Sequence, residues 1–126
     1  MKDPGLVRAM CESLVAAVAH RGVNLSVKCR NGVDDVDSYE DLKKFIGMAS
    51  STGIEDFVIH SRKALLGLRT RQNFSVPPIN YEYAYQLIKD FPECRFVING
   101  EIQTAEHVPV HLANGVRTLW FSMMFD

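Results

Sequence analysis

Few cysteines, no long apolar run and almost no net charge narrow the classes to which this chain can belong. Its cysteines are Cys11, Cys29 and Cys94, and no two of them have Cys-x-x-Cys spacing. We expect buried free thiols in a reducing compartment instead of disulfides or a zinc site. No run of about 18 apolar residues is present, which argues against a membrane-spanning helix. A cytoplasmic protein is therefore expected, with an organellar location left open.

Charge and length set two further limits. The formal net charge is −1, from 14 basic and 15 acidic residues among 126, so a surface that binds nucleic acid must be a local basic patch. A chain of this length fits one small domain. Because no linker, repeat or low-complexity tract interrupts it, we predict a single domain over residues 1–126.

The spacing of apolar residues predicts helices and strands in alternation. Helical spacing appears near residues 4–21, 39–52 and 80–91, and more weakly near 104–114. Short runs typical of strands appear near residues 25–30, 56–60, 95–98 and 116–121. Strands that alternate with helices lie parallel and are joined by right-handed crossovers, so the predicted fold class is α/β.

Local signals refine three of the helices. Asp3 followed by Pro4 should begin the first, and its apolar residues recur at Leu6, Met10, Leu14 and Ala17, with Val7, Cys11 and Val18 beside them. Ser38 and Asp41 have capping-box spacing, and the helix that follows should bury Leu42, Phe45, Ile46 and Ala49. Pro109 has no backbone donor and is expected to interrupt the last helix.

Three predicted strands carry a polar residue at their ends, namely Lys28, His60 and Asn99. Because parallel strands gather their carboxyl ends at one edge, where α/β proteins bind ligands, we interpret these residues as one functional rim. The alternatives are a lysine paired with an acid, a hydrogen-bonded core histidine and a solvated strand end. Arg30 and Arg62 follow one step further out, as phosphate ligands or as structural ion pairs.

The connection over residues 61–78 is long for a compact domain, which favours a functional loop. It carries Lys63, Arg69 and Arg71 between leucines, a composition suited to RNA phosphates, and the alternative is a solvated charged loop. His107 and His111 have the i, i+4 spacing of metal ligands. No third ligand is evident near them, so no metal site is predicted.

Four stretches of the chain resemble the tRNA-dihydrouridine synthases, especially the bacterial A-type branch and its plant and algal relatives. They read Val-Lys-Cys-Arg-Asn-Gly-Val-Asp-Asp at 27–35, Val-Ile-His-Ser-Arg-Lys-Ala at 58–64, Pro-Pro-Ile-Asn-Tyr at 77–81 and Ile-Asn-Gly at 98–100. Their order and spacing fit nearly the whole chain, which makes the resemblance specific.

The resemblance implies an FMN-dependent (β/α)8 barrel that reduces uridine in tRNA to 5,6-dihydrouridine, with NADPH as the hydride source. Such a barrel needs about 200 residues or more, so we expect a partial TIM barrel, corresponding to strands five to eight. By resemblance, Lys28 and His60 contact FMN, and Asn99 and Gly100 form a turn that binds its phosphate. With the basic loop, the resemblance favours tRNA contacts at Arg30, Arg62, Lys63, Arg69 and Arg71.

The chain departs from the family pattern in ways that affect the expected site. Glu101 stands where a second glycine is usual, and Phe121 is followed by Ser-Met-Met-Phe-Asp where the family has Gly-Arg. Both changes weaken the expected hold on the FMN phosphate. None of the cysteines matches the family's catalytic cysteine, which protonates uracil C5, so no catalytic residue is assigned.

Two functional classes stay open at this point. One is a fragment of an FMN-dependent enzyme, which by itself is expected to be inactive. The other is a non-catalytic truncated half-barrel with residual flavin or RNA affinity. A different flavin barrel that acts on a metabolite is disfavoured by the motif over residues 28–35. Because four strands leave two open edges, self-association through these edges is also predicted.

Overall fold

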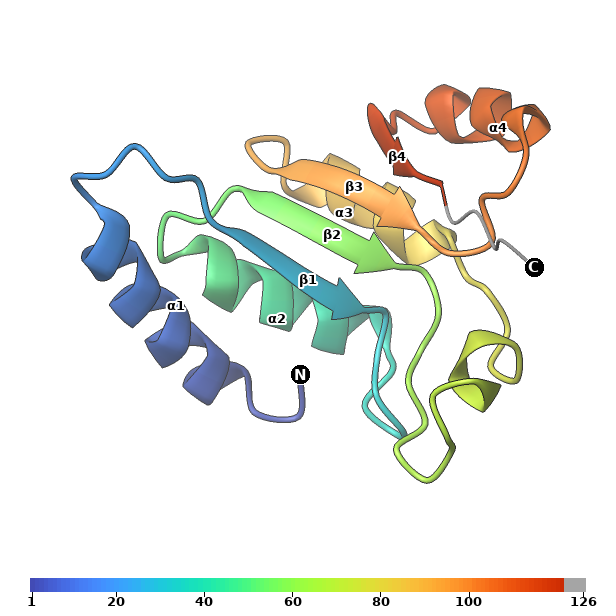
Figure 1. Ribbon diagram of the computed structural model, residues 1–126, viewed down its shortest axis with the longest axis horizontal. Coiled ribbons are helices and arrows are strands. Elements are labelled where there is room, and N and C mark those ends of the chain that lie inside the picture. The colour runs from blue at the N-terminus through green and yellow to red at the C-terminus, as the bar shows by residue number, and fades with distance from the viewer. Residues whose placement is uncertain (122–126) are drawn as a thin grey trace.

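The computed structural model describes residues 1–121, and its helices and strands alternate as predicted (Figure 1). The helices are α1 (Pro4–Val18), α2 (Tyr39–Ser50), α3 (Glu82–Asp90) and α4 (Val108–Ala113). The strands are β1 (Ser26–Arg30), β2 (Asp56–His60), β3 (Arg95–Asn99) and β4 (Thr118–Trp120). Two short 3-10 turns, η1 (Gln72–Phe74) and η2 (Ala105–His107), lie in the connections that follow β2 and β3.

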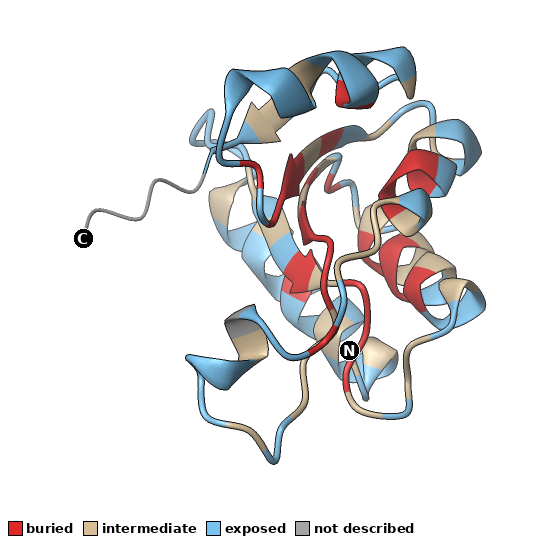
Figure 2. Ribbon diagram, turned by 90° about the vertical axis from the view of Figure 1, so that its right-hand side faces the viewer, coloured by how far each residue is buried: buried red, intermediate tan, exposed pale blue. Residues whose placement is uncertain are grey.

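The strands form one parallel sheet in the order β1-β2-β3-β4, which confirms the α/β class. Phe57 and Ile59 of β2 and Phe96 and Ile98 of β3 are buried, and they form the core together with residues of α2 and α3. The rings of Phe57 and Phe96 stack with centroids 5.7 Å apart. Figure 2 shows buried positions, in red, along the strands and in stretches of the helices.

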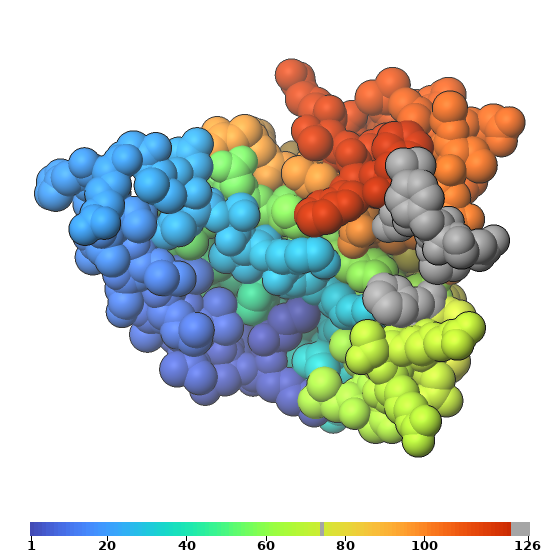
Figure 3. All heavy atoms as spheres, viewed as in Figure 1, coloured from blue at the N-terminus to red at the C-terminus, as the bar shows by residue number. Residues whose placement is uncertain are grey.

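The opposite face of the sheet carries the other half of each strand's side chains, because strand residues alternate between faces. Lys28 and Thr118 are exposed on it, and Val58 and Val97 are only partly buried. No helix within residues 1–121 packs on this face, which is turned toward the viewer in Figure 3. The loop over residues 61–78 stands beside the carboxyl end of β1 in the same view.

Local helix signals were mostly confirmed. The Asp3 carboxylate accepts a hydrogen bond from the Leu6 amide at 2.9 Å, as an N-cap does. Ser38 and Asp41 form the predicted capping box, and the predicted residues of α2 are buried. Pro109 does not interrupt the last helix but lies in the first turn of α4. Its missing donor costs nothing there, because first-turn amides have no partner within the helix.

The structure decides which apolar residues of α1 face the core, a choice that the sequence left open. Cys11 is 4% exposed, whereas Leu6, Met10 and Leu14 are 59%, 57% and 51% exposed. Val7, next to Leu6, packs partly buried against the core. Neighbouring helix positions lie about 100° apart, so α1 carries two adjacent apolar stripes, and only docking on α2 selects between them.

None of the helices in residues 1–121 combines the length and apolar character that crossing a bilayer requires.

Candidate functional site

The structure brings the predicted residues to one face of the sheet, with His60 and Asn99 at its carboxyl edge and Lys28 in the middle of β1. The register pairs Arg30 with His60 and His60 with Asn99. Lys28 lies two residues before Arg30 in β1, so it points to the same face. His60 and Asn99 are each 8% exposed, Arg30 is half-buried and Lys28 is exposed. We call these four residues the rim.

The rim is electropositive, and the lowered pKa of His60 reflects the positive charges around it. Burial lowers the pKa of His60 from 6.5 to about 4, helped by the positive charges of Arg30, Lys28 and Arg62. The imidazole is therefore neutral at physiological pH, because burial and then the neighbouring cations disfavour a second proton. A site of this kind favours a ligand that carries negative charge.

We expect the ring of His60 to titrate near pH 4 in the folded protein and Lys28→Met to raise this pKa, because one repelling cation is removed. Since the pKa is depressed on folding, this group reduces the free energy of unfolding as the pH falls from 6.5 toward 4. NMR titration of the histidine ring resonances measures both pKa values. A His60 that titrates like a free imidazole in the wild type would contradict the electropositive rim.

Residues 77–81, here called the strap, connect the loops that follow β1 and β2. The Asn80 amide donates to the Ser61 carbonyl at 2.7 Å. The Asn80 carbonyl accepts from the Asn31 side-chain amide at 2.7 Å. Asn31 and Asn80 both lie in stretches that carried the family resemblance, but the sequence alone assigned neither a role at the rim. These two hydrogen bonds of Asn80 fix the strap across the carboxyl ends of β1 and β2.

The strap also packs against the turn that follows β3. The Tyr81 hydroxyl donates to the Gly100 carbonyl at 2.5 Å. Gly100 has φ +123°, and a Cβ at this position would lie 2.8 Å from Ile79 Cδ1 and 3.0 Å from His60 Cδ2. A side chain does not fit there, so glycine is required both by its backbone conformation and by the close approach of its neighbours.

Arg62 lies inside the protein and not on its surface. Its side chain is 2% exposed, and it donates to the Pro77 carbonyl and forms an ion pair with the Glu101 carboxylate. Of the two interpretations of Arg62 from sequence, this geometry matches the structural ion pair. The Glu101 side chain is 51% exposed, and its backbone has φ +53°, which is uncommon for a residue other than glycine.

The basic loop over residues 61–78 is held by its own polar groups. Arg30 donates to the carbonyls of Lys63 and Asn73, each at 3.1 Å. Lys63 forms an ion pair with Asp37 at 2.6 Å. The Asn73 side chain bridges the loop internally, with hydrogen bonds to the Leu65 backbone at 2.7 and 2.8 Å, a role that the sequence analysis missed. Arg30 and Lys63 thus shape the loop.

Arg69 and Arg71, the other two basic residues predicted to contact tRNA, are exposed. They line a shallow surface hollow together with Gln72 and Ser75. Neither arginine has a described ion pair within residues 1–121. They therefore present positive charge to solvent, as a contact to phosphate requires.

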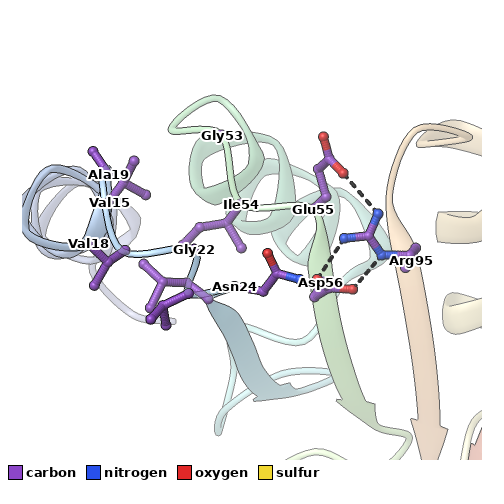
Figure 4. Close-up of a pocket in the computed structure, with 12 residues that line it drawn as sticks. Val15, Val18, Ala19, Gly22, Asn24, Gly53, Ile54, Glu55, Asp56 and Arg95 are labelled. Atoms are coloured by element: carbon purple, nitrogen blue, oxygen red, sulfur yellow. Dashed lines mark hydrogen bonds and ion pairs between the residues drawn. The ribbon is translucent and has the colours of Figure 1, made fainter.

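A different hollow, of about 340 Å³, lies at the opposite edge of the sheet (Figure 4). Its apolar side comes from Val15, Val18 and Ile54, and its polar side from Asp56 and Arg95. Arg95 pairs with Asp56 at 2.7 Å, which satisfies the charges of both. Because this hollow lies at the amino ends of the strands, it contains no residue of the rim.

The two histidines with metal-like spacing do not converge. His111 is buried, and its Nδ1 lies 2.9 Å from the Tyr85 hydroxyl, whereas His107 is exposed. In the part of the chain that the structure describes, no cluster of three His, Cys, Asp or Glu side chains is placed to hold a metal ion.

Comparison with known proteins then identifies the family. The family model described as dihydrouridine synthase matches residues 1–120. The chain belongs to the dihydrouridine synthase family. This membership confirms the resemblance, and the parallel sheet agrees with the predicted partial TIM barrel.

Curated relatives of this dihydrouridine synthase chain carry the name tRNA-dihydrouridine(20/20a) synthase. The protein from Synechocystis is 40% identical over 115 residues, which are 90% of the chain. Those from Pasteurella multocida and Vibrio cholerae are 45% identical over 91 residues and 42% identical over 114 residues, covering 71% and 89% of the chain. The chain spans about a third of the length of these relatives, namely 34%, 28% and 34%.

The cysteines of this dihydrouridine synthase chain lie away from its rim. Cys29 is buried on the helix-facing side of β1, and burial raises the pKa of its thiol to about 12. Cys11 is buried on α1. Cys94 directly precedes β3, at the opposite edge of the sheet. None of the three is placed to give a proton to a ligand bound at the rim.

Proposed function

We propose that this chain forms part of the flavin- and tRNA-binding face of a tRNA-dihydrouridine synthase. The observation that carries the proposal is the rim. Arg30, His60 and Asn99 lie at the carboxyl edge of a parallel sheet, and Lys28 lies on the same face two residues before Arg30. The names of the curated relatives supply the reaction, and the electropositive character of the rim supports an anionic cofactor.

Two observations support FMN as that cofactor. The positive field at His60 suits the negative charge of a reduced flavin or of a phosphate. Gly100 has φ +123°, a backbone conformation found in glycine turns that direct amide groups toward an anion. Lys28 and His60 would hold the flavin ring, and Asn99 and Gly100 its phosphate. When bound, FMN would transfer the hydride of NADPH to uracil C6.

For tRNA, we propose direct phosphate contacts at Arg69 and Arg71, which are exposed. Arg30, Arg62 and Lys63 would contribute by holding the loop and the strap in place, since their side chains bind backbone carbonyls and carboxylates. This division assigns flavin binding and tRNA binding to different residues, so the two can be measured separately.

The test is a pair of substitutions with opposite expected effects. We expect FMN to bind weakly, because the rim supplies one wall of a site, and Lys28→Ala to lower this affinity by about tenfold while Arg71→Ala leaves it unchanged. For tRNA the order should reverse, and the slope of log affinity against log salt should fall by about 1 in Arg71→Ala. Flavin fluorescence and filter binding measure the two affinities. Equal effects of both substitutions on FMN would contradict the assignment. Tight stoichiometric FMN binding would contradict the expected weak affinity.

The segment after Phe121, where the sequence lacks the Gly-Arg of the family, covers residues 122–126 and lies outside the described residues.

Self-association through the outer strands remains a proposal. It is supported by the exposure of Trp120, the last residue of β4, and of Phe121 directly after it, at 50% and 43%. Sedimentation of the chain at micromolar concentration should show dimers or larger species. A monomer at all concentrations would contradict it.

A further inference from the structure

Glu101 places a carboxylate directly after Gly100, at the turn where the proposed function puts a phosphate. Two features argue against an incidental surface acid. Its backbone lies in the left-handed region, with φ +53°, a conformation that glycine adopts more readily. Its side chain is half-exposed and yet turns back to form an ion pair with the buried Arg62.

Arg62 cannot turn to solvent to meet another anion. Its side chain is 2% exposed, and one terminal nitrogen is held by the Pro77 carbonyl of the strap. Its charge nevertheless reaches the rim, because it contributes to the lowered pKa of His60. Glu101 is the acid that pairs with Arg62 within residues 1–121, so this carboxylate neutralises one of the cations that would attract a ligand anion.

We propose that Glu101 is an internal counter-anion that competes with a ligand phosphate for the positive charge of Arg62 next to the rim. The inference rests on the proposed function and adds to it a residue that sets affinity. In the unliganded protein, Glu101 balances Arg62. A phosphate that approaches the Gly100 amide meets this carboxylate at close range, and it binds when the Glu101 side chain swings outward into solvent. The Glu101 carboxylate and the phosphate repel each other because both are negative. Moving Glu101 away from Arg62 costs free energy, and this cost lowers the affinity for phosphate.

Glu101→Gln tests the proposal, because it keeps the shape and one acceptor for Arg62 but removes the charge. Glu106→Gln is the matched control, since it removes the same charge from the same connection, where Glu106 is exposed and accepts from the Thr104 hydroxyl at 3.3 Å. Glu101→Gly is the second variant, because glycine suits φ +53°.

The probe is inorganic phosphate, and the readout is the NMR shift of the Gly100 amide. We expect Glu101→Gln and Glu101→Gly to bind phosphate roughly tenfold more tightly than the wild type, and Glu106→Gln to match the wild type. Phosphate binding by both Glu101 variants that is no tighter than in the wild type, including no binding by any protein, would overturn the inference.

A parallel titration with FMN separates this inference from the proposed function. A gain in phosphate affinity without FMN binding by any variant would leave Glu101 as a counter-anion and remove the flavin assignment. FMN binding that is equal in all variants, with equal phosphate affinity, would overturn the role of Glu101 and leave the flavin assignment standing.

Discussion

Gly100→Ala is expected to destabilise the protein strongly and to abolish anion binding at the rim. The new Cβ would lie 2.8 Å from Ile79 Cδ1 and 3.0 Å from His60 Cδ2, so the Ile79 side chain must turn away and the His60 ring must shift slightly. Backbone strain at positive φ costs about 1–3 kcal/mol and overpacking about 1–3 kcal/mol more, so we expect a loss of roughly 2–6 kcal/mol. Urea unfolding measures the free energy of unfolding, and phosphate titration measures binding.

Gly53→Ala is the matched control for this prediction. Gly53 has φ +94°, but a Cβ there would have no neighbour within 4 Å. Its alanine variant should therefore show the cost of backbone strain alone and retain anion binding. An equal loss of stability in the two variants would show that crowding between the strap and the rim contributes nothing.

The purified chain is expected to form no dihydrouridine when it is supplied with NADPH, FMN and unmodified tRNA. Reduction at uracil C6 needs a proton at C5, and an acid must stand at the rim to give it. The cysteines do not: Cys11 and Cys29 are buried against the helices, and Cys94 lies at the other edge of the sheet. Mass spectrometry of digested tRNA detects the product.

The positive control for this assay is the Vibrio cholerae tRNA-dihydrouridine(20/20a) synthase, of which the present chain spans 34%. Product from the control and none from the chain is the expected result. Dihydrouridine formed by the chain alone would show that another residue donates the proton. Cys29→Ser and Cys94→Ser variants would then test whether either thiol takes part.

The elements themselves follow from short stretches of sequence. The capping box of α2 joins residues three apart, and the four predicted core residues of that helix are all buried. The alternation in β1 places Lys28 and Arg30 on one face and Cys29 on the other before any tertiary contact is known. Hydrogen bonds and periodicities of this range need no information from distant residues, which explains why the order and class of the elements were predicted correctly.

The exact partners of the charged and apolar side chains were decided by the tertiary structure. Residues 39 positions apart form the Arg62–Glu101 pair, so sequence left Arg62 open between a surface ligand and a buried cation. Arg30 reaches the Asn73 carbonyl 43 positions away and so helps to support the loop, a contact that no local pattern predicted. On α1, two apolar stripes were equally periodic, and docking on α2 buried Cys11 and left Met10 exposed. These contacts depend on which surfaces pack together in the folded protein, and a local sequence pattern does not specify that packing.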